Sequence, residues 1–338
     1  MNSLEVRKKT ITNIHESEFK FVIVSSGGGS NAIGSLLKVP GASNSILEAY
    51  IPYAKESLDF YLMKKPESYC SLDTTTRMAA RAYSAAKKID QKTNIEQLFG
   101  VAISATLSTN YEKKGSHRFH IAVQTRDFSQ SISCILNKGQ RTREEEEELV
   151  TEFVIALISD CCGFEFKYPE IKEDVEHIQI PAQKGWADLM SEKIKFVTSS
   201  NQQPKLIFPG AFNPMHDGHI AMSELANKEL SEEVFFEICI QNVDKPPLSY
   251  HQIKKTIDQF TDSKNWVLTK AGKFSDKAKL FPNSTFIIGA DTLVRIFDER
   301  FYASRREMME EFEIFNANNN NFLVFGREYK NKFIELND

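Results

Sequence analysis

Cysteine is scarce in this chain, the charges nearly balance, and long apolar runs are missing. The 338 residues include only five cysteines, an odd number without a CxxC spacing, which argues against a disulfide framework or a structural zinc site. A formal net charge of -4 gives no sign of a nucleic-acid-binding surface. No window holds the roughly 18 to 20 apolar residues that span a bilayer, and the start of the chain has no apolar signal core. We therefore expect a cytoplasmic protein with no nucleic-acid or membrane partner.

The length predicts two domains, since a chain of 338 residues exceeds the roughly 100 to 200 residues of one domain. A hydrophobic content of 41% is that of an ordinary globular protein. The pattern loosens after residue 167 and ends in the polar, proline-containing stretch TSSNQQPK. We expect a first domain over 1–167, a connecting segment over 168–204 and a second domain over 205–338.

Short apolar runs alternate with helical patterns in both halves, which predicts two α/β domains. In the second half the runs are short and apolar throughout, as expected of strands buried on both faces of a parallel, Rossmann-like sheet. The predicted strands there are 205–208, 234–240, 284–291 and 321–325. In the first half we expect strands at 19–26, 99–107 and 118–125, and helices at 74–89 and 141–158.

Two histidines three residues apart directly follow the first predicted strand of the second half. His216 and His219 lie in FPGAFNPMHDGHIA, where a strand turns into a helix. Ligands bind beyond the carboxyl ends of parallel strands, and a helix N-terminus with free N–H groups suits a phosphate. Gly210 and Gly218 would let the backbone approach such a ligand closely. A bare HxxH spacing is also compatible with a metal site or a helix cap.

The full string GAFNPMHDGH resembles the GxFxPxHxGH signature of the nucleotidylyltransferase superfamily. The resemblance implies that both histidines contact a nucleotide triphosphate and stabilise charge while the α-phosphate is attacked. A second string, FIIGADTL, is similar to the IIGADxL segment of bacterial-type nicotinate mononucleotide adenylyltransferases, although by itself it also fits a strand exit with an N-cap aspartate. The nucleotide contacts implied by the two strings are Gly210, Ala211, Phe212, Asn213, Gly218, Gly289 and Asp291.

One basic residue is a further candidate, and one family motif is missing. Lys245, in NVDKPPL, is either a phosphate-binding cation of the active site or an ordinary solvated loop lysine. The ISSTxxR-like motif that such enzymes carry after the last core strand is not found up to Asp338, since Arg327, Lys330 and Lys332 do not form it. Two expectations follow, a gene truncated at its C-terminus or a domain with weakened ATP binding.

The first half is similar to the CinA C-terminal family, whose members deamidate nicotinamide mononucleotide. The string SSGGGSNAIGSLLKVPGAS follows that family's ES-x-TGG turn and PGAS segment. The resemblance implies Ser25 as nucleophile and Lys55 as its activating base. Val24 and Gly27 replace a glutamate and a threonine of the family, so a degenerate member that keeps the fold without the chemistry is the alternative. The implied substrate or oxyanion contacts are Tyr50, Ser104 and Arg141.

Together the resemblances imply a mononucleotide adenylyltransferase with an appended deamidase-like domain. Its substrates would be ATP and a mononucleotide, with Mg²⁺ bound mainly by the phosphates, and no protein metal cage is expected. The open alternatives are another transferase of the superfamily, using CTP or a pantetheine-type acceptor, and a catalytically inactive nucleotide-binding regulatory protein. Whether the chain forms a homo-oligomer stays open.

Overall fold

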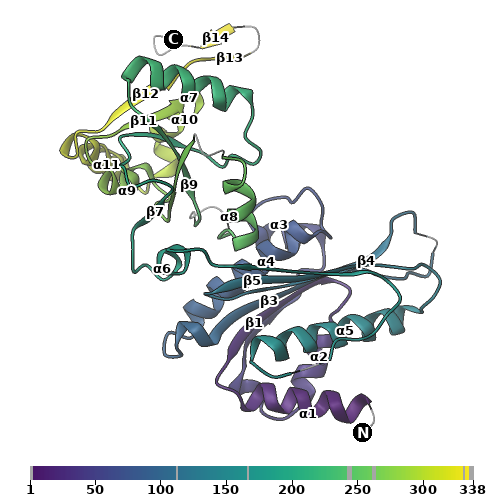
Figure 1. Cartoon of the computed structure of the whole chain (residues 1–338). Coiled ribbons are helices and arrows are strands. Elements are labelled where there is room, and N and C mark those ends of the chain that lie inside the picture. The colour runs from purple at the N-terminus through teal and green to yellow at the C-terminus, as the bar shows by residue number, and fades with distance from the viewer. Residues whose placement is uncertain are drawn as a thin grey trace. The chain divides into compact units, whose positions relative to one another are not determined.

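The computed structural model describes residues 3–111, 113–165, 167–241, 246–260, 264–329 and 332–334, which form two compact units (Figure 1). The first unit comprises Met1–Ala187 together with Asp244–Gln252, and the second comprises Asp188–Val243 and Ile253–Asp338. The segment 244–252 therefore belongs to the first unit, although the chain on both sides of it belongs to the second. Each unit has its own sheet and its own core.

The sheet of the first unit has the strand order β2-β1-β3-β4-β5-β6. The pairs β1–β2 and β1–β3 are parallel, whereas β3–β4, β4–β5 and β5–β6 are antiparallel. The sheet is thus mixed, with two parallel and three antiparallel strand pairs. Its strands are β1 (Lys20–Gly27), β2 (Ile46–Tyr50), β3 (Leu98–Thr106), β4 (His117–Gln124), β5 (Phe128–Leu136) and β6 (Val175–Pro181).

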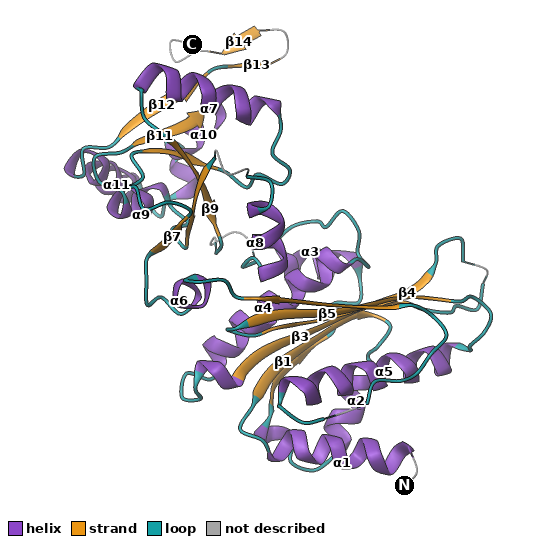
Figure 2. Ribbon diagram, in the orientation of Figure 1, coloured by secondary structure: helices purple, strands orange, loops and turns teal. Residues whose placement is uncertain are grey.

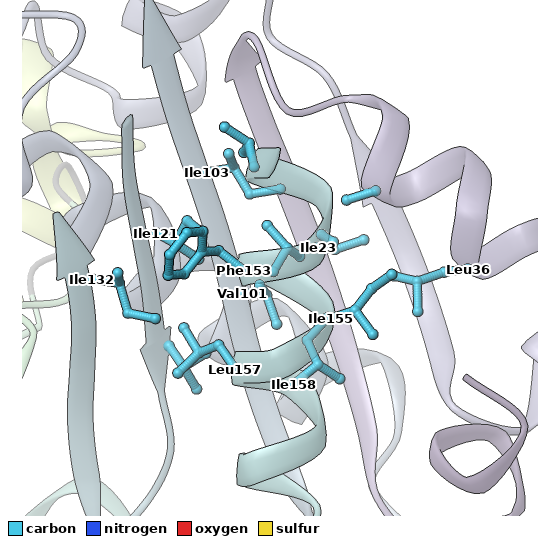
Figure 3. Packing of buried hydrophobic residues seen from close by; sticks show 14 of the residues in the cluster. Ile23, Leu36, Val101, Ile103, Ile121, Ile132, Phe153, Ile155, Leu157 and Ile158 are labelled. Atoms are coloured by element: carbon cyan, nitrogen blue, oxygen red, sulfur yellow. The ribbon is translucent and has the colours of Figure 1, made fainter. Parts of the chain in front are cut away.

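Helices cover both faces of this sheet (Figure 2). On one face α1 (Ser3–Glu16), α2 (Asn31–Lys38) and α5 (Arg143–Cys161) enclose the larger core, and Figure 3 shows isoleucines of four strands packed around Phe153 of α5. On the other face lie α3 (Lys55–Leu62) and α4 (Leu72–Ile89). Because side chains alternate along a strand, each strand residue belongs to one face or the other.

The two longest helices of the first unit begin at side-chain caps. Thr142 precedes α5, and its hydroxyl accepts a hydrogen bond from the backbone N–H of Glu145, whose carboxylate accepts one from the N–H of Thr142 in return. Ser71 caps α4 in a similar way through the N–H of Thr74. The glutamate-rich start of α5 suits the positive end of the helix dipole.

The sheet of the second unit has the order β12-β11-β8-β9-β10-β7, and its strands are parallel except for β7. The first of the parallel strands in chain order, β8, lies between β9 and β11, so the connections run outward in both directions from β8. This doubly wound order is Rossmann-like, as the apolar runs predict. The strands are β7 (Phe196–Thr198), β8 (Leu206–Pro209), β9 (Val234–Cys239), β10 (Asn265–Thr269), β11 (Thr285–Gly289) and β12 (Asn321–Phe325).

The core of the second unit lies where this sheet packs against its helices. Ile207, Phe235 and Phe286 face α9 and α11, and alternation turns Phe208 and Phe236 to the opposite face. The remaining elements of this unit include the short antiparallel pair β13 (Arg327–Tyr329) and β14 (Lys332–Ile334). The helices are α7 (Asp217–Leu230), α8 (Tyr250–Ile257), α9 (Phe274–Leu280), α10 (Ala290–Ile296) and α11 (Arg305–Ala317), and α8 begins in the segment that belongs to the first unit.

All seven predicted strands and both predicted helices are present, and the differences lie in one strand end, in strands that are not predicted and in the connecting segment. The strand predicted over 284–291 ends at Gly289, because Ala290 already begins α10. Strands β5 and β10 fall in regions where no strand is predicted. The segment 168–204, expected to connect the domains, contains β6 at the edge of the first sheet, α6 (Trp186–Met190), and β7 at the edge of the second.

Candidate active site

The two histidines and the GAD string follow adjacent strands of the second sheet. His216 follows β8 and Gly289 ends β11, and β8 pairs with β11 in parallel. The parallel strands run outward from β8 to β9 and β10, and the chain then continues on the other side of β8 with β11. The carboxyl ends of β8 and β11 therefore lie at the topological switch point, where open α/β sheets bind ligands. Helix α7, which His216 precedes, also contacts β11. The fold therefore brings the two sequence motifs to one edge of the sheet.

His216 and His219 form a stacked pair at the start of α7. Their ring centroids lie 3.7 Å apart with 27° between the planes. The backbone N–H of His216 donates to Nδ1 of His219 at 3.3 Å, which leaves the proton of a neutral His219 ring on Nε2. Partial burial, and then the neighbouring His216, lower the pKa of His219. At neutral pH His219 is therefore uncharged and presents an N–H donor.

Phe212 is the apolar anchor of this loop. It is buried, and its ring makes edge contacts with Phe208, Phe236 and His219, the last with centroids 5.1 Å apart. Its backbone has a positive φ of 42°, and the peptide bond between Asn213 and Pro214 is cis. The buried ring of Phe212 thus packs against the imidazole of His219 and holds it in place. Ala211 and Asn213, on either side of Phe212, are exposed.

Of the three glycines of the two motifs, Gly210 has the closest neighbour, and a side chain at Gly218 or Gly289 would need only a small shift of an adjacent side chain. A Cβ on Gly210 would lie 2.5 Å from the ring of Phe212, and one on Gly218 would lie 3.1 Å from the ring of His216. A Cβ on Gly289 would lie 2.9 Å from Oδ1 of Asp291, which is exposed in the first turn of α10. The absence of side chains lets the loop pack on its own aromatic and polar groups. Lys245, the remaining predicted residue of this site, lies outside the described residues.

In the first unit, Ser25 lies on the sheet face of the larger core, whereas Lys55 begins a helix that packs on the other face. Ser25 is fully buried, pairs in register with Ile103 of the larger core, and donates to the carbonyl of Gly28 at 3.3 Å. Lys55 begins α3 on the opposite face, where it is exposed and lies 5.7 Å from the ring of Tyr69.

The other residues predicted for this unit make structural contacts. Tyr50 stacks on Tyr61, with ring centroids 5.2 Å apart. The guanidinium of Arg141 is paired with the nearly buried carboxylate of Glu173 at 2.5 and 3.0 Å, and this ion pair lowers the pKa of Glu173 to about 2. Ser104 is buried and shares a hydrogen bond of 2.6 Å with the hydroxyl of Thr75.

The glycine-rich turn after β1 has its amides occupied by protein groups. The N–H of Gly28 donates to the carbonyl of Ala105 at 3.0 Å, and that of Gly29 donates to the carboxylate of Glu147 at 2.7 Å. A turn that binds phosphate needs such N–H groups to face the ligand. In this chain the carboxylate of Glu147, on α5, accepts the N–H of Gly29, where a phosphate oxygen would otherwise bind.

A row of polar side chains crosses the same sheet from β1 to β5. Consecutive register pairs join Ser26 to Ser104, Ser104 to His120, and His120 to Ser133. Nδ1 of His120 lies 2.8 Å from the hydroxyl of Ser133. Burial, together with the charge of Arg118, lowers the pKa of His120 to about 4.

Acid should therefore destabilise the first unit through His120. In the unfolded state His120 takes up a proton near the ordinary histidine pKa of about 6.5, whereas in the folded state it does so only near pH 4. The contribution of His120 to the free energy of unfolding is therefore complete above pH 6.5 and is lost as the pH falls toward 4. Replacing His120 with asparagine removes this titration. The urea concentration at the midpoint of unfolding of the first unit is measured at several pH values from 7.5 to 4. It should decrease less steeply with falling pH for the variant than for the wild type. Parallel curves would contradict the assignment.

Comparison with known families bears on the second unit. Residues 207–334 match the cytidylyltransferase-like family model. This part of the chain is similar to cytidylyltransferase-like domains, and it is called the cytidylyltransferase-like domain from here on. The match includes both predicted motifs, from the loop after β8 to the GAD string after β11.

Solved structures are similar to the chain over a little less than half of its length. They include a competence/damage inducible protein, CihA, from Agrobacterium tumefaciens, with 16% identity, 47% of this chain and 91% of that chain covered, and a TM-score of 0.34. A competence or damage-inducible protein from Enterobacter asburiae has 14% identity, coverages of 48% and 99%, and a TM-score of 0.39. A competence-damaged protein (CinA) superfamily protein from Enterobacter cloacae has 13% identity, coverages of 48% and 94%, and a TM-score of 0.39. No curated protein matches the chain.

A buried ion pair underlies the candidate site of the cytidylyltransferase-like domain, and no sequence motif indicates it. Nζ of Lys277, on α9, donates to both carboxylate oxygens of Glu237, on β9, at 2.7 and 2.8 Å, and to the carbonyl of Ala271 at 2.6 Å. The hydroxyl of Thr269 donates to the same carboxylate. The backbone carbonyl of Glu237 accepts the N–H of Gly210, so this network adjoins the first residue of the histidine loop.

The cytidylyltransferase-like domain and the first unit show neither a metal cluster nor a membrane helix in their described parts. Within those residues no group of three or more His, Cys, Asp or Glu side chains could hold a metal ion. The five cysteines, all described, are free thiols. No described helix is long and apolar enough to cross a membrane.

Proposed function

We propose that the cytidylyltransferase-like domain transfers AMP from ATP to nicotinate mononucleotide or nicotinamide mononucleotide. The observation that carries the proposal is the stacked pair of His216 and His219 at the start of α7, at the switch point beside β11. The IIGAD string, of which Gly289 ends β11, favours the nicotinate branch over other acceptors. With nicotinate mononucleotide the reaction would form the dinucleotide precursor of NAD, and with nicotinamide mononucleotide it would form NAD itself, so either is a step of NAD biosynthesis.

In the proposed reaction an oxygen of the mononucleotide phosphate attacks the α-phosphorus of ATP. A new P–O–P bond forms, the bond between the α-phosphorus and its bridging oxygen breaks, and pyrophosphate leaves with that oxygen. Nε2 of neutral His219 donates to an α-phosphate oxygen as charge gathers there, and His216 contacts the same phosphates. Free N–H groups at the start of α7 add to this stabilisation.

The triphosphate brings its own cation in this proposal. Mg²⁺ prefers oxygen ligands, keeps several waters and is commonly bound through substrate phosphates with few protein carboxylates. It would neutralise the leaving pyrophosphate. Asp291 is exposed at the same edge of the sheet, and it is the described carboxylate of the two motifs best placed to meet the nucleotide.

A substrate panel tests the proposal. Purified full-length protein is incubated with ATP or CTP, each with nicotinate mononucleotide, nicotinamide mononucleotide or phosphopantetheine, and the products are identified by mass spectrometry. We expect dinucleotide and pyrophosphate only with ATP and a pyridine mononucleotide. Product from CTP or from phosphopantetheine would assign the domain to another branch of the superfamily. ATP binding by calorimetry without any product would favour the regulatory alternative.

For the first unit we propose that Ser25 and Lys55 do not act as a deamidase pair. Ser25 is buried in the core on one face of the sheet, and Lys55 begins a helix on the other face. The amide of Gly29 is already bound to Glu147. In a separate reaction, nicotinamide mononucleotide without a nucleoside triphosphate should release no ammonia, and release that a Ser25→Ala variant abolishes would contradict this part of the proposal.

A further inference from the structure

The backbone between Gly210 and His216 depends on a side chain from elsewhere in the second unit. Pro214 has no N–H to donate, which leaves this stretch one donor fewer for hydrogen bonds of its own, and Phe212 adopts a positive φ. Gly210 is tied to β9 through the carbonyl of Glu237, and His219 begins the helical hydrogen bonds at the carbonyl of His216. Between these two anchors the loop needs partners for its own donors and acceptors.

Gln259 supplies both partners. It follows the C-terminal end of α8, and its Oε1 accepts the N–H of Met215 at 2.8 Å, while its Nε2 donates to the carbonyl of Phe212 at 2.8 Å. The two bonded groups flank the cis peptide bond between Asn213 and Pro214. Nε2 also donates to the carbonyl of Thr256 at 3.3 Å, which connects the side-chain amide to the last turn of α8.

Phe260, the residue after Gln259, also contacts the loop. The ring of Phe260 packs against Phe212, with centroids 5.9 Å apart, and against Phe236 at 5.1 Å. Phe212 in turn contacts the ring of His219. Residues 259 and 260 therefore hold the loop by its backbone and by its anchoring ring, and a carboxamide is suited to the first task because it carries a donor and an acceptor on one rigid plane.

We propose that Gln259 is a positioning residue for the nucleotidyl transfer, which rests on the proposed function of this domain. Gln259 touches no substrate. Its hydrogen bonds to the backbone of Phe212 and Met215 hold the loop in place, and this fixes the position of His216 and His219 relative to the α-phosphate. A misplacement of the order of 1 Å at a reacting centre lowers rates roughly 100-fold, so loosening this clamp should be visible mainly in kcat.

The test uses two variants and a neighbouring control in the full-length chain. Gln259→Met removes both hydrogen bonds at similar volume, and Gln259→Glu keeps only an acceptor for the N–H of Met215. Asp258→Asn changes the adjacent exposed residue, which pairs with Lys254 on the surface of α8. We expect kcat to fall roughly 10- to 100-fold in both Gln259 variants, with the Kd for ATP and the unfolding midpoint nearly unchanged, and no change in Asp258→Asn.

Hydrogen exchange at the Met215 amide separates this inference from the proposed function. Exchange should be slow in the wild type, fast in Gln259→Met and slow again in Gln259→Glu, whether or not the protein turns over. A wild type without transfer activity but with this exchange pattern would refute the reaction and leave the clamp in place. A slow Met215 amide in Gln259→Met, or a wild-type kcat in both Gln259 variants, would overturn the inference.

Discussion

Replacing His219 with alanine should lower kcat/KM for dinucleotide formation by about 100- to 1,000-fold, or about 2.7 to 4 kcal/mol of transition-state stabilisation. That is the usual cost of removing one preorganised donor from a site where charge develops. His219 is preorganised because the N–H of His216 fixes Nδ1 as the acceptor, and because the rings of Phe208 and Phe212 hold the imidazole from the side.

Two matched variants separate the roles of the two ring nitrogens. His219→Asn places an amide oxygen near the position of Nδ1, so it can keep the contact with His216 while losing the donor to phosphate. His219→Gln can place an N–H near the position of Nε2 while losing that contact. We expect the glutamine variant to retain more of kcat/KM than the asparagine variant. A wild-type kcat/KM in His219→Ala would rule out the mechanism.

Replacing Lys277 with methionine should lower the free energy of unfolding of the second unit by about 3 to 5 kcal/mol. The side chains of Lys277 and Glu237 are 5% and 1% exposed, so removing the ammonium leaves a carboxylate buried without its charge partner. Thr269 still donates to that carboxylate, but one hydroxyl does not replace an ammonium with two bonds to it.

The double variant Glu237→Gln with Lys277→Met should recover most of this loss. It removes both charges, and replacement of a buried ion pair by neutral groups of similar volume is often close to neutral. Urea unfolding followed by the fluorescence of Trp266, on β10 of the second unit, measures the effect with Trp186 of the first unit as internal reference. A Lys277→Met protein as stable as the wild type would show that the pair contributes little.

The sequence predicts the second unit well, because its strands are short apolar runs between helical patterns. β8, β9, β11 and β12 are all found near their predicted positions. β10, with the sequence NWVLT, escapes prediction because it is short and stands between polar stretches. β5 escapes for a related reason, since its alternate residues Ser129, Ser131 and Ser133 are serines rather than apolar side chains.

The candidate site is predictable only where a local motif marks it. The histidines and glycines of the loop lie within ten residues of one another, and the motif names them. Gln259 and Lys277 act over 44 and 40 residues of sequence separation, so no spacing rule links them to Met215 or Glu237. Ser25 is selected by a motif resemblance alone, and the motif does not indicate that this residue is buried in register with Ile103, on the face of Ile23.

The most direct test of this account follows both products of the transfer in one reaction. Full-length protein is supplied with ATP, Mg²⁺ and nicotinate mononucleotide, and dinucleotide and pyrophosphate are measured together for the wild type and for His219→Ala. The proposed mechanism predicts equal amounts of the two products from the wild type and at least a 100-fold slower formation of both by the variant. Pyrophosphate without dinucleotide, or equal rates for the two proteins, would contradict it.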